Sequence, residues 1–176
     1  MIRVWDPWVR LFHWSLVASF VVAWLSAQRW EDLHDGAGYV AGALVALRLV
    51  WGFAGSRYAR FSQFVRSPRI IIDYLGSIAA SGERRFLGHN PAGGAMILAL
   101  LAGIVFVVFT GCLMTTDTFW GETWLQRTHS ILAHGFVVLI ALHLGGVAVA
   151  SLRHRENLVR AMIVGTKRAA EANDVV

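Results

Sequence analysis

Cysteine is almost absent from the sequence, since Cys112 is the only one and lies inside an apolar run. One thiol excludes an internal disulfide, an iron–sulfur cluster bound by four cysteines, and a cofactor attached through Cys-x-x-Cys-His. Charge is scarce as well, because only 15% of the 176 residues are charged while 56% are hydrophobic. A soluble domain of this size rarely carries so little charge, so the composition favours a membrane protein.

Four long apolar segments account for the hydrophobic composition: residues 9–27, 36–54, 93–115 and 130–152. Each is close to the roughly 20 residues that a helix needs to cross a bilayer. The first segment is expected to be a retained helix, because it contains His13 and neighbouring tryptophans, and no small-residue cleavage site follows it. The sequence therefore predicts an all-α membrane protein, with one four-helix transmembrane domain over residues 1–176.

Lysine is as rare as cysteine, and the arginines are unevenly distributed. They concentrate at the N-terminus, between the second and third segments, and in the C-terminal tail that also holds Lys167. The other two loops carry only Arg29 and Arg127, together with five carboxylates. Arginine-rich loops stay in the cytoplasm, so we expect a multi-pass protein of a bacterial inner membrane with both termini cytoplasmic. This distribution indicates contact with membrane lipid and no nucleic-acid partner.

The arginine-rich segment between the second and third spans contains a further short helix, predicted at about residues 67–80. Ser67 is a favourable N-cap and Pro68 a favourable first helical residue. The apolar positions and flanking arginines suit a helix lying on the inner membrane surface, and a solvated loop helix is the alternative. The polar tail after Lys167 is expected to fray.

Four of the seven histidines match in depth as two pairs. His129 and His143 lie fourteen residues apart, which on a helix puts both rings within about 40° of one face and roughly 21 Å apart. His34 begins the second segment at the outer level of His129, and His13 lies at the inner level of His143. Two imidazoles at each level are what bis-histidine ligation of a b-type haem needs. The alternative is that each histidine hydrogen-bonds a backbone carbonyl or a hydroxyl.

The remaining polar residues of these segments are assigned by the same helical geometry. Arg48 lies fourteen residues after His34 and so shares its face at the inner level. A haem propionate would partner this costly charge, unless Arg48 reaches the inner interface instead. His134 is about 140° from His129 around the helix and is not expected to be a ligand. His89 and His154 are expected to face water, with a place near a substrate pocket as the alternative for His89.

The chain resembles the prokaryotic cytochrome b561 family, which includes the b-type subunits of Ni/Fe hydrogenases. The resemblance covers nearly the whole chain, through residues 4–14 (VWDPWVRLFHW), 34–39 (HDGAGY), 48–53 (RLVWGF), 88–94 (GHNPAGG), 129–143 and 155–162 (RENLVRAM). It implies a four-helix cytochrome that binds two b haems, with His13, His34, His129 and His143 as ligands. No fifth span is evident, so the chain looks more like the short members that work with c-type cytochromes than like hydrogenase subunits.

The resemblance implies a dihaem protein that carries electrons across the membrane between the quinone pool and a redox partner. Acidic outer loops would attract a basic partner such as a c-type cytochrome, while the oligomeric state, homo- or hetero-oligomeric, is left open. A quinol needs a proton acceptor, and the candidates are Asp6 and His89 on the inner side, or Glu31, Asp32 and Asp35 on the outer side.

Two other functions are considered. The first is a stand-alone superoxide:quinone oxidoreductase, for which Arg29 and Arg127 would supply a cationic path, although nearby carboxylates oppose anion steering. The second, of another class, is a histidine-based metal-binding membrane protein or transporter. It is disfavoured because the membrane histidines form two separated levels and no acidic residue lies at mid-membrane.

Overall fold

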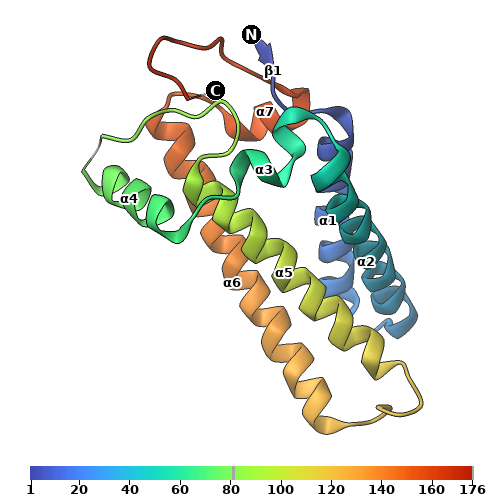
Figure 1. The fold of residues 1–176 in the computed structure, drawn as a ribbon. Helices are drawn as coiled ribbons and strands as arrows, with labels where there is room; N and C mark the ends of the chain where they lie inside the picture. The colour runs from blue at the N-terminus through green and yellow to red at the C-terminus, as the bar shows by residue number, and fades with distance from the viewer. Residues whose placement is uncertain (81, 176) are drawn as a thin grey trace. The chain divides into compact units, whose positions relative to one another are not determined.

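The computed structural model describes residues 1–80 and 82–175, most of which are helical. Four helices are long and apolar enough to cross a membrane (Figure 1): α1 (Pro7–Ser26), α2 (Glu31–Ala54), α5 (Pro91–Met114) and α6 (Thr123–Arg153). The shorter elements are β1 (Ile2–Arg3), the 3-10 helix η1 (Arg57–Ala59), α3 (Phe61–Phe64), α4 (Pro68–Ala79), α7 (Leu158–Val164) and β2 (Thr166–Lys167). The predicted four-helix membrane architecture is confirmed.

All four long helices begin before their apolar segments do, and α2 and α6 begin earlier by five residues or more. α2 begins at Glu31, because Glu31 and Asp32 in its first turn are favourable beside the positive end of the helix dipole. α6 begins at Thr123, and its polar first turns are anchored by Leu125, which is only 1% exposed. Hydropathy marks the apolar part of a helix, whereas backbone hydrogen bonding continues through polar residues that favour it. As a result, His34 and His129 both lie inside regular helix.

The chain forms two compact units. The first unit comprises Met1–Arg10, Val50–Leu98 and Ala141–Val176, and the second comprises Leu11–Leu49 and Ala99–Ile140. The arginine-rich segments and the short elements belong to the first unit, and the two acidic loops belong to the second.

Small residues bring the helices of the second unit close together. A Cβ added to Gly42 of α2 would lie 2.9 Å from Val108 of α5, and one added to Gly103 of α5 would lie 2.9 Å from Phe136 of α6. Phe136 also meets Phe20 of α1 edge to face, with 5.1 Å between ring centres. Membrane helices associate through such close van der Waals contact, and the second unit is a four-helix bundle.

The first unit has a small apolar core built from the two chain ends. Val4, Trp5 and Ala161 are buried together, and β1 pairs antiparallel with β2 just beside them. Gly165 permits this arrangement, because its φ of 85° is in the left-handed region and an added Cβ would lie 2.8 Å from the Trp5 carbonyl oxygen. The sequence did not predict this strand pair.

The C-terminal tail is ordered, so the expectation that it frays after Lys167 is wrong. The backbone of Val175 donates to the Arg85 carbonyl at 2.9 Å and accepts from the Leu87 amide at 3.0 Å. The Asp174 carboxylate also pairs with the Arg85 guanidinium. These contacts join residues about 90 apart in the sequence, which local composition does not reveal.

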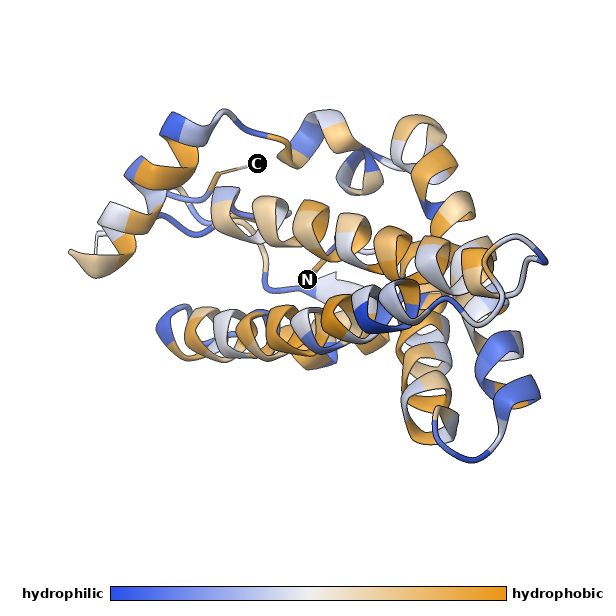
Figure 2. Cartoon of the chain, turned by 90° about the horizontal axis from the view of Figure 1, so that it is seen from below, coloured by the Kyte–Doolittle hydropathy of each residue, from blue (hydrophilic) through white to orange (hydrophobic). Residues whose placement is uncertain are grey.

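Large apolar side chains are widely exposed on the long helices. Leu25, Ile131 and Leu152 are 71%, 72% and 79% exposed. Figure 2 shows hydrophobic residues along these helices and hydrophilic residues concentrated in the connecting segments. Exposure of this extent is unfavourable in water and is what lipid contact requires, so these surfaces face the bilayer.

Candidate functional site

Two of the predicted ligand histidines meet inside the second unit. His34 lies in the first turn of α2 and His129 in the second turn of α6, and both are partly buried. Their ring centres are 6.0 Å apart and their planes are nearly perpendicular, at 81°. The structure therefore brings together two histidines from different helices that the sequence analysis had paired by their expected depth in the membrane.

The His34 ring is held in one tautomer by the backbone of α1. Its Nδ1 lies 2.8 Å from the carbonyl oxygen of Ala23. A carbonyl only accepts hydrogen bonds, so Nδ1 carries the proton and the neutral ring keeps its lone pair on Nε2. A metal-binding histidine commonly donates its other N–H to a backbone carbonyl in this way.

The His129 ring is held in the same tautomer by Thr110 of α5. The Thr110 hydroxyl lies 3.0 Å from His129 Nδ1 and 2.9 Å from the carbonyl oxygens of Phe106 and Val107. A hydroxyl has one proton, and here carbonyls of its own helix receive it. Nδ1 must then donate to the hydroxyl oxygen, which leaves a lone pair on Nε2 of His129.

The donor set fits an ion bound between two imidazoles. Each imidazole nitrogen binds a metal ion at about 2 Å, so rings on opposite sides of one ion have centres roughly 6 Å apart. Gly38 follows His34 by one turn of α2, and an added Cβ there would meet no atom within 4 Å. His34 and His129 would hold a haem through their two Nε2 atoms, and the space beside Gly38 would leave room for a flat macrocycle. Within the described parts of the chain, no three His, Cys, Asp or Glu side chains form a group suited to a bare metal ion.

The other predicted cofactor-binding residues are placed individually. His13 lies in the part of α1 that belongs to the second unit, with its ring 5.0 Å from that of Trp14 in an edge contact. His143 is partly buried on α6, in the part that belongs to the first unit. Their pairing stays a prediction. Arg48 of α2 is only 5% exposed, so its charge is buried, and its contact with a propionate stays a prediction.

His134 and His89 have surroundings that differ from each other. His134 is exposed on α6, its Nδ1 lies 2.8 Å from the Ser130 carbonyl oxygen, and its ring meets Trp24 edge-on. The expectation that His89 faces water is wrong. Its ring packs 4.5 Å from Trp5 and 5.0 Å from Phe64 in the first unit, measured between ring centres.

Asp6 is a structural residue at the start of α1. Its carboxylate accepts from the Val9 amide at 2.8 Å, from the Ser56 hydroxyl, and from Trp51 Nε1 at 3.3 Å. Burial raises the pKa of the Asp6 carboxyl, but these hydrogen bonds outweigh burial and hold that pKa below its usual range. A carboxylate so well satisfied is a poor proton acceptor for a substrate.

Sequence reasoning missed Thr110. A lone threonine in an apolar helix commonly bonds its own backbone, so the sequence offers no signal that this hydroxyl also fixes a histidine on another helix. The available signal is its position along the chain: Thr110 lies in the last turns of α5, close to the loop that leads to α6 and His129.

The comparison with known protein families agrees with this geometry. The family model described as prokaryotic cytochrome b561 matches residues 4–165. No curated protein and no solved structure is detectably similar to the chain. The matched range contains α1 through α7 and all four candidate ligand histidines.

Proposed function

The chain belongs to the prokaryotic cytochrome b561 family, and on that premise we propose that it is a dihaem electron carrier between the quinone pool and a redox protein. It is a multi-pass inner-membrane protein and a b-type cytochrome in electron transfer. One haem is held by His34 and His129, and the other by His13 and His143. The observation that carries the proposal is the His34–His129 pair, in which both Nε2 atoms are left available.

The residues of the chain set the conditions for electron transfer. When bound, each b haem supplies a one-electron redox centre. The Ala23 carbonyl and the Thr110 hydroxyl orient the two imidazoles before binding, so little reorganisation follows. The positive charge of Arg48 is buried on the face of α2 that also carries His34. A haem propionate would stabilise this charge further through a charge-assisted hydrogen bond.

We place the arginine-rich segments and both termini in the cytoplasm, on the positive-inside rule. The acidic loops then face outward and offer a basic c-type cytochrome its docking surface. Among the candidate proton acceptors for a quinol, the hydrogen bonds of Asp6 count against it. His89 on the inner side and Glu31, Asp32 and Asp35 on the outer side remain as candidates.

The test is anaerobic mixing of the purified protein with a quinol, followed by oxidised c-type cytochrome. The haem absorption bands are expected to show reduction by quinol and reoxidation by the c-type cytochrome. A protein that stays oxidised with quinol refutes the proposed substrate. Reduction by superoxide together with a lack of reaction with c-type cytochrome would support the stand-alone oxidoreductase instead.

A further inference from the structure

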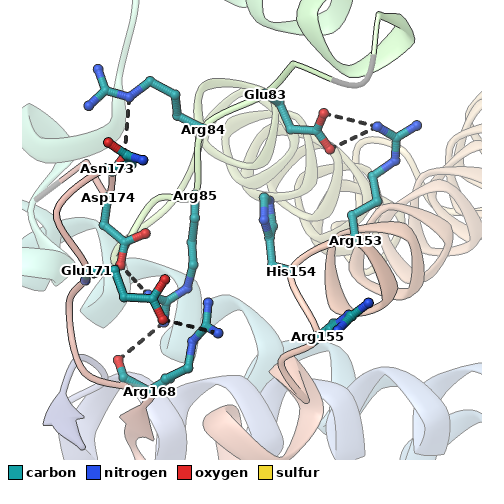
Figure 3. Close-up of a pocket in the computed structure, with 10 residues that line it drawn as sticks. All are labelled: Glu83, Arg84, Arg85, Arg153, His154, Arg155, Arg168, Glu171, Asn173 and Asp174. Carbon is teal, nitrogen blue, oxygen red and sulfur yellow. Dashed lines mark hydrogen bonds and ion pairs between the residues drawn. The ribbon is translucent and has the colours of Figure 1, made fainter.

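A polar pocket in the first unit is occupied by its own ion pairs. It has a volume of about 540 Å³ and lies among the segment after α4, the end of α6 and the C-terminal tail (Figure 3). Arg85 is held between Asp174 and Glu156, and Arg153 pairs with Glu83 at 2.9 Å. Carboxylates lie among the guanidinium groups, so the charges compensate one another. These contacts hold the C-terminal tail in place, and the feature that points to a ligand lies in the second unit.

His134 of α6 is a polar side chain on a surface that faces lipid. Ile131 precedes it by three residues and Val138 follows it by four, so all three lie on one face of the helix. Ile131 and Val138 are 72% and 58% exposed, and His134 is exposed between them. An ionisable side chain within a membrane helix is costly and usually has a function. Its place on the lipid-facing surface indicates a partner that arrives through the bilayer.

One ring nitrogen of His134 is left as a hydrogen-bond acceptor. Its Nδ1 lies 2.8 Å from the Ser130 carbonyl oxygen. A carbonyl only accepts hydrogen bonds, so Nδ1 carries the proton and the neutral ring keeps a lone pair on Nε2. Among residues 1–80 and 82–175, no donor bonds this Nε2. The partner that satisfies it must therefore supply a hydroxyl or an N–H group.

Trp24 of α1 forms an aromatic wall beside the His134 ring. The two ring centres are 5.2 Å apart, and their planes meet at 74°. Trp24 is 40% exposed and stacks on Phe20, with 6.0 Å between ring centres. Next to His134 on α6, Gly135 leaves open space, since an added Cβ would meet no atom within 4 Å. An exposed indole, an available acceptor and open space suit a flat aromatic ring that carries a hydroxyl group.

The Trp24–His134 pair adjoins the His34–His129 pair. Ala23, whose carbonyl accepts from His34, directly precedes Trp24 on α1. On α6, His134 follows His129 by five residues, which is about 7.5 Å along the helix axis and about 140° around it. The two pairs are thus separated by roughly one helix diameter, about 10 Å. A redox-active ligand beside Trp24 would be close enough to exchange electrons with a haem held by the other pair.

We propose that Trp24 and His134 bind the quinol of the proposed reaction, on which this inference rests. A hydroxyl group of the quinol donates to His134 Nε2, and the quinol ring packs against the Trp24 indole. Quinols dissolve in the bilayer, so they reach a lipid-facing surface directly. Oxidation to the quinone removes both hydroxyl protons together with two electrons, which the proposed reaction passes to the haems. The quinone cannot donate to Nε2, so the site favours the reduced form and releases the product.

The test compares two ligands that differ in their hydroxyl groups. Haem-loaded protein is reduced, desalted under nitrogen and titrated by native mass spectrometry with decylubiquinol or with its dimethyl ether, which has no hydroxyl donor. Because the protein is already reduced, binding is measured without turnover. The parent should bind the quinol about fivefold more tightly than the ether, the factor that one hydrogen bond contributes.

Four variants, compared at equal haem content, test the two side chains. His134→Phe removes the acceptor and should lower quinol affinity about fivefold, to that of the ether, whose own affinity should stay within about twofold. His134→Gln returns an acceptor oxygen and should restore part of the preference for quinol. Trp24→Leu should weaken both ligands by about fivefold, because each packs against the indole. Trp124→Leu is the matched control, since Trp124 is also exposed in the second unit but contacts Phe119, and it should bind as the parent does.

A His134→Phe variant that keeps the preference for quinol over ether would refute the role of His134. A changed oligomeric mass of that variant, with quinol binding as in the parent, would assign the exposed face to a contact between copies and overturn the inference. Reduction of the haems by quinol separates these outcomes from the proposed function. A parent that quinol does not reduce would overturn the proposed function, whereas a His134→Phe variant reduced with the KM of the parent would overturn the site alone.

Discussion

Replacing Thr110 with valine tests how the protein controls its histidine ligands. The change keeps the shape of the side chain and removes the hydroxyl oxygen that accepts from His129 Nδ1 at 3.0 Å. Without this acceptor the imidazole becomes a weaker donor to iron, which disfavours the oxidised metal. A hydrogen bond of this kind contributes about 1 kcal/mol. For a one-electron couple, that energy corresponds to a rise of about 40 mV in the potential of the haem bound by His129.

The assay is a potentiometric titration followed by the absorption of the reduced haems. The haem assigned to His13 and His143 is an internal reference, and its potential should stay within the error of the titration. Thr110→Ser is the matched control, because it restores the hydroxyl and should return the potential towards that of the parent. Equal potentials in the parent and the valine variant, at equal haem content, would refute the inferred tautomer and its role.

Three further predictions concern other parts of the chain. His143→Ala should lose one haem while His134→Ala keeps both, as judged by pyridine haemochrome assays; full haem content in the His143 variant would contradict the pairing. Lys167 is buried over the Trp5 ring, and burial lowers its pKa from 10.5 to about 8. The unfolded chain then holds more protons than the folded one between pH 8 and 10.5, so the stability of the parent should rise with pH in that window. Lys167→Met should abolish the rise and add up to about 3 kcal/mol at pH 7, measured by unfolding in detergent; a parent whose stability falls in that window would exclude the buried charge. Asp6→Ala should cost roughly 1–2 kcal/mol through loss of the cap on α1 without changing the pH dependence of quinol oxidation, and a changed pH profile would return Asp6 to the substrate site.

The parts of the fold that follow from local composition were predictable. Each spanning helix is marked by an apolar run long enough for the bilayer, and the pairing of His34 with His129 follows from helix periodicity and chain direction. The structure confirms the four spans. It also places the His34 and His129 rings close to one another. Predicting this pair depended on estimating the depth of each histidine along its helix.

The parts that depend on contacts between distant segments were not predictable. The His89 ring is partly buried because Trp5 and Phe64 pack against it from two other segments. The C-terminal tail is ordered because Asp174 reaches Arg85. Neither burial nor order has a signature in the local sequence, since each depends on side chains that only the folded chain brings together.

The haem content per chain tests the account most directly. Protein purified with its cofactor is analysed by pyridine haemochrome absorption and by quantitative amino-acid analysis of the same sample. The two histidine pairs predict two b haems for each chain. One haem per chain in fully loaded protein would contradict the dihaem account, and would leave His34 and His129 as the pair best supported by geometry.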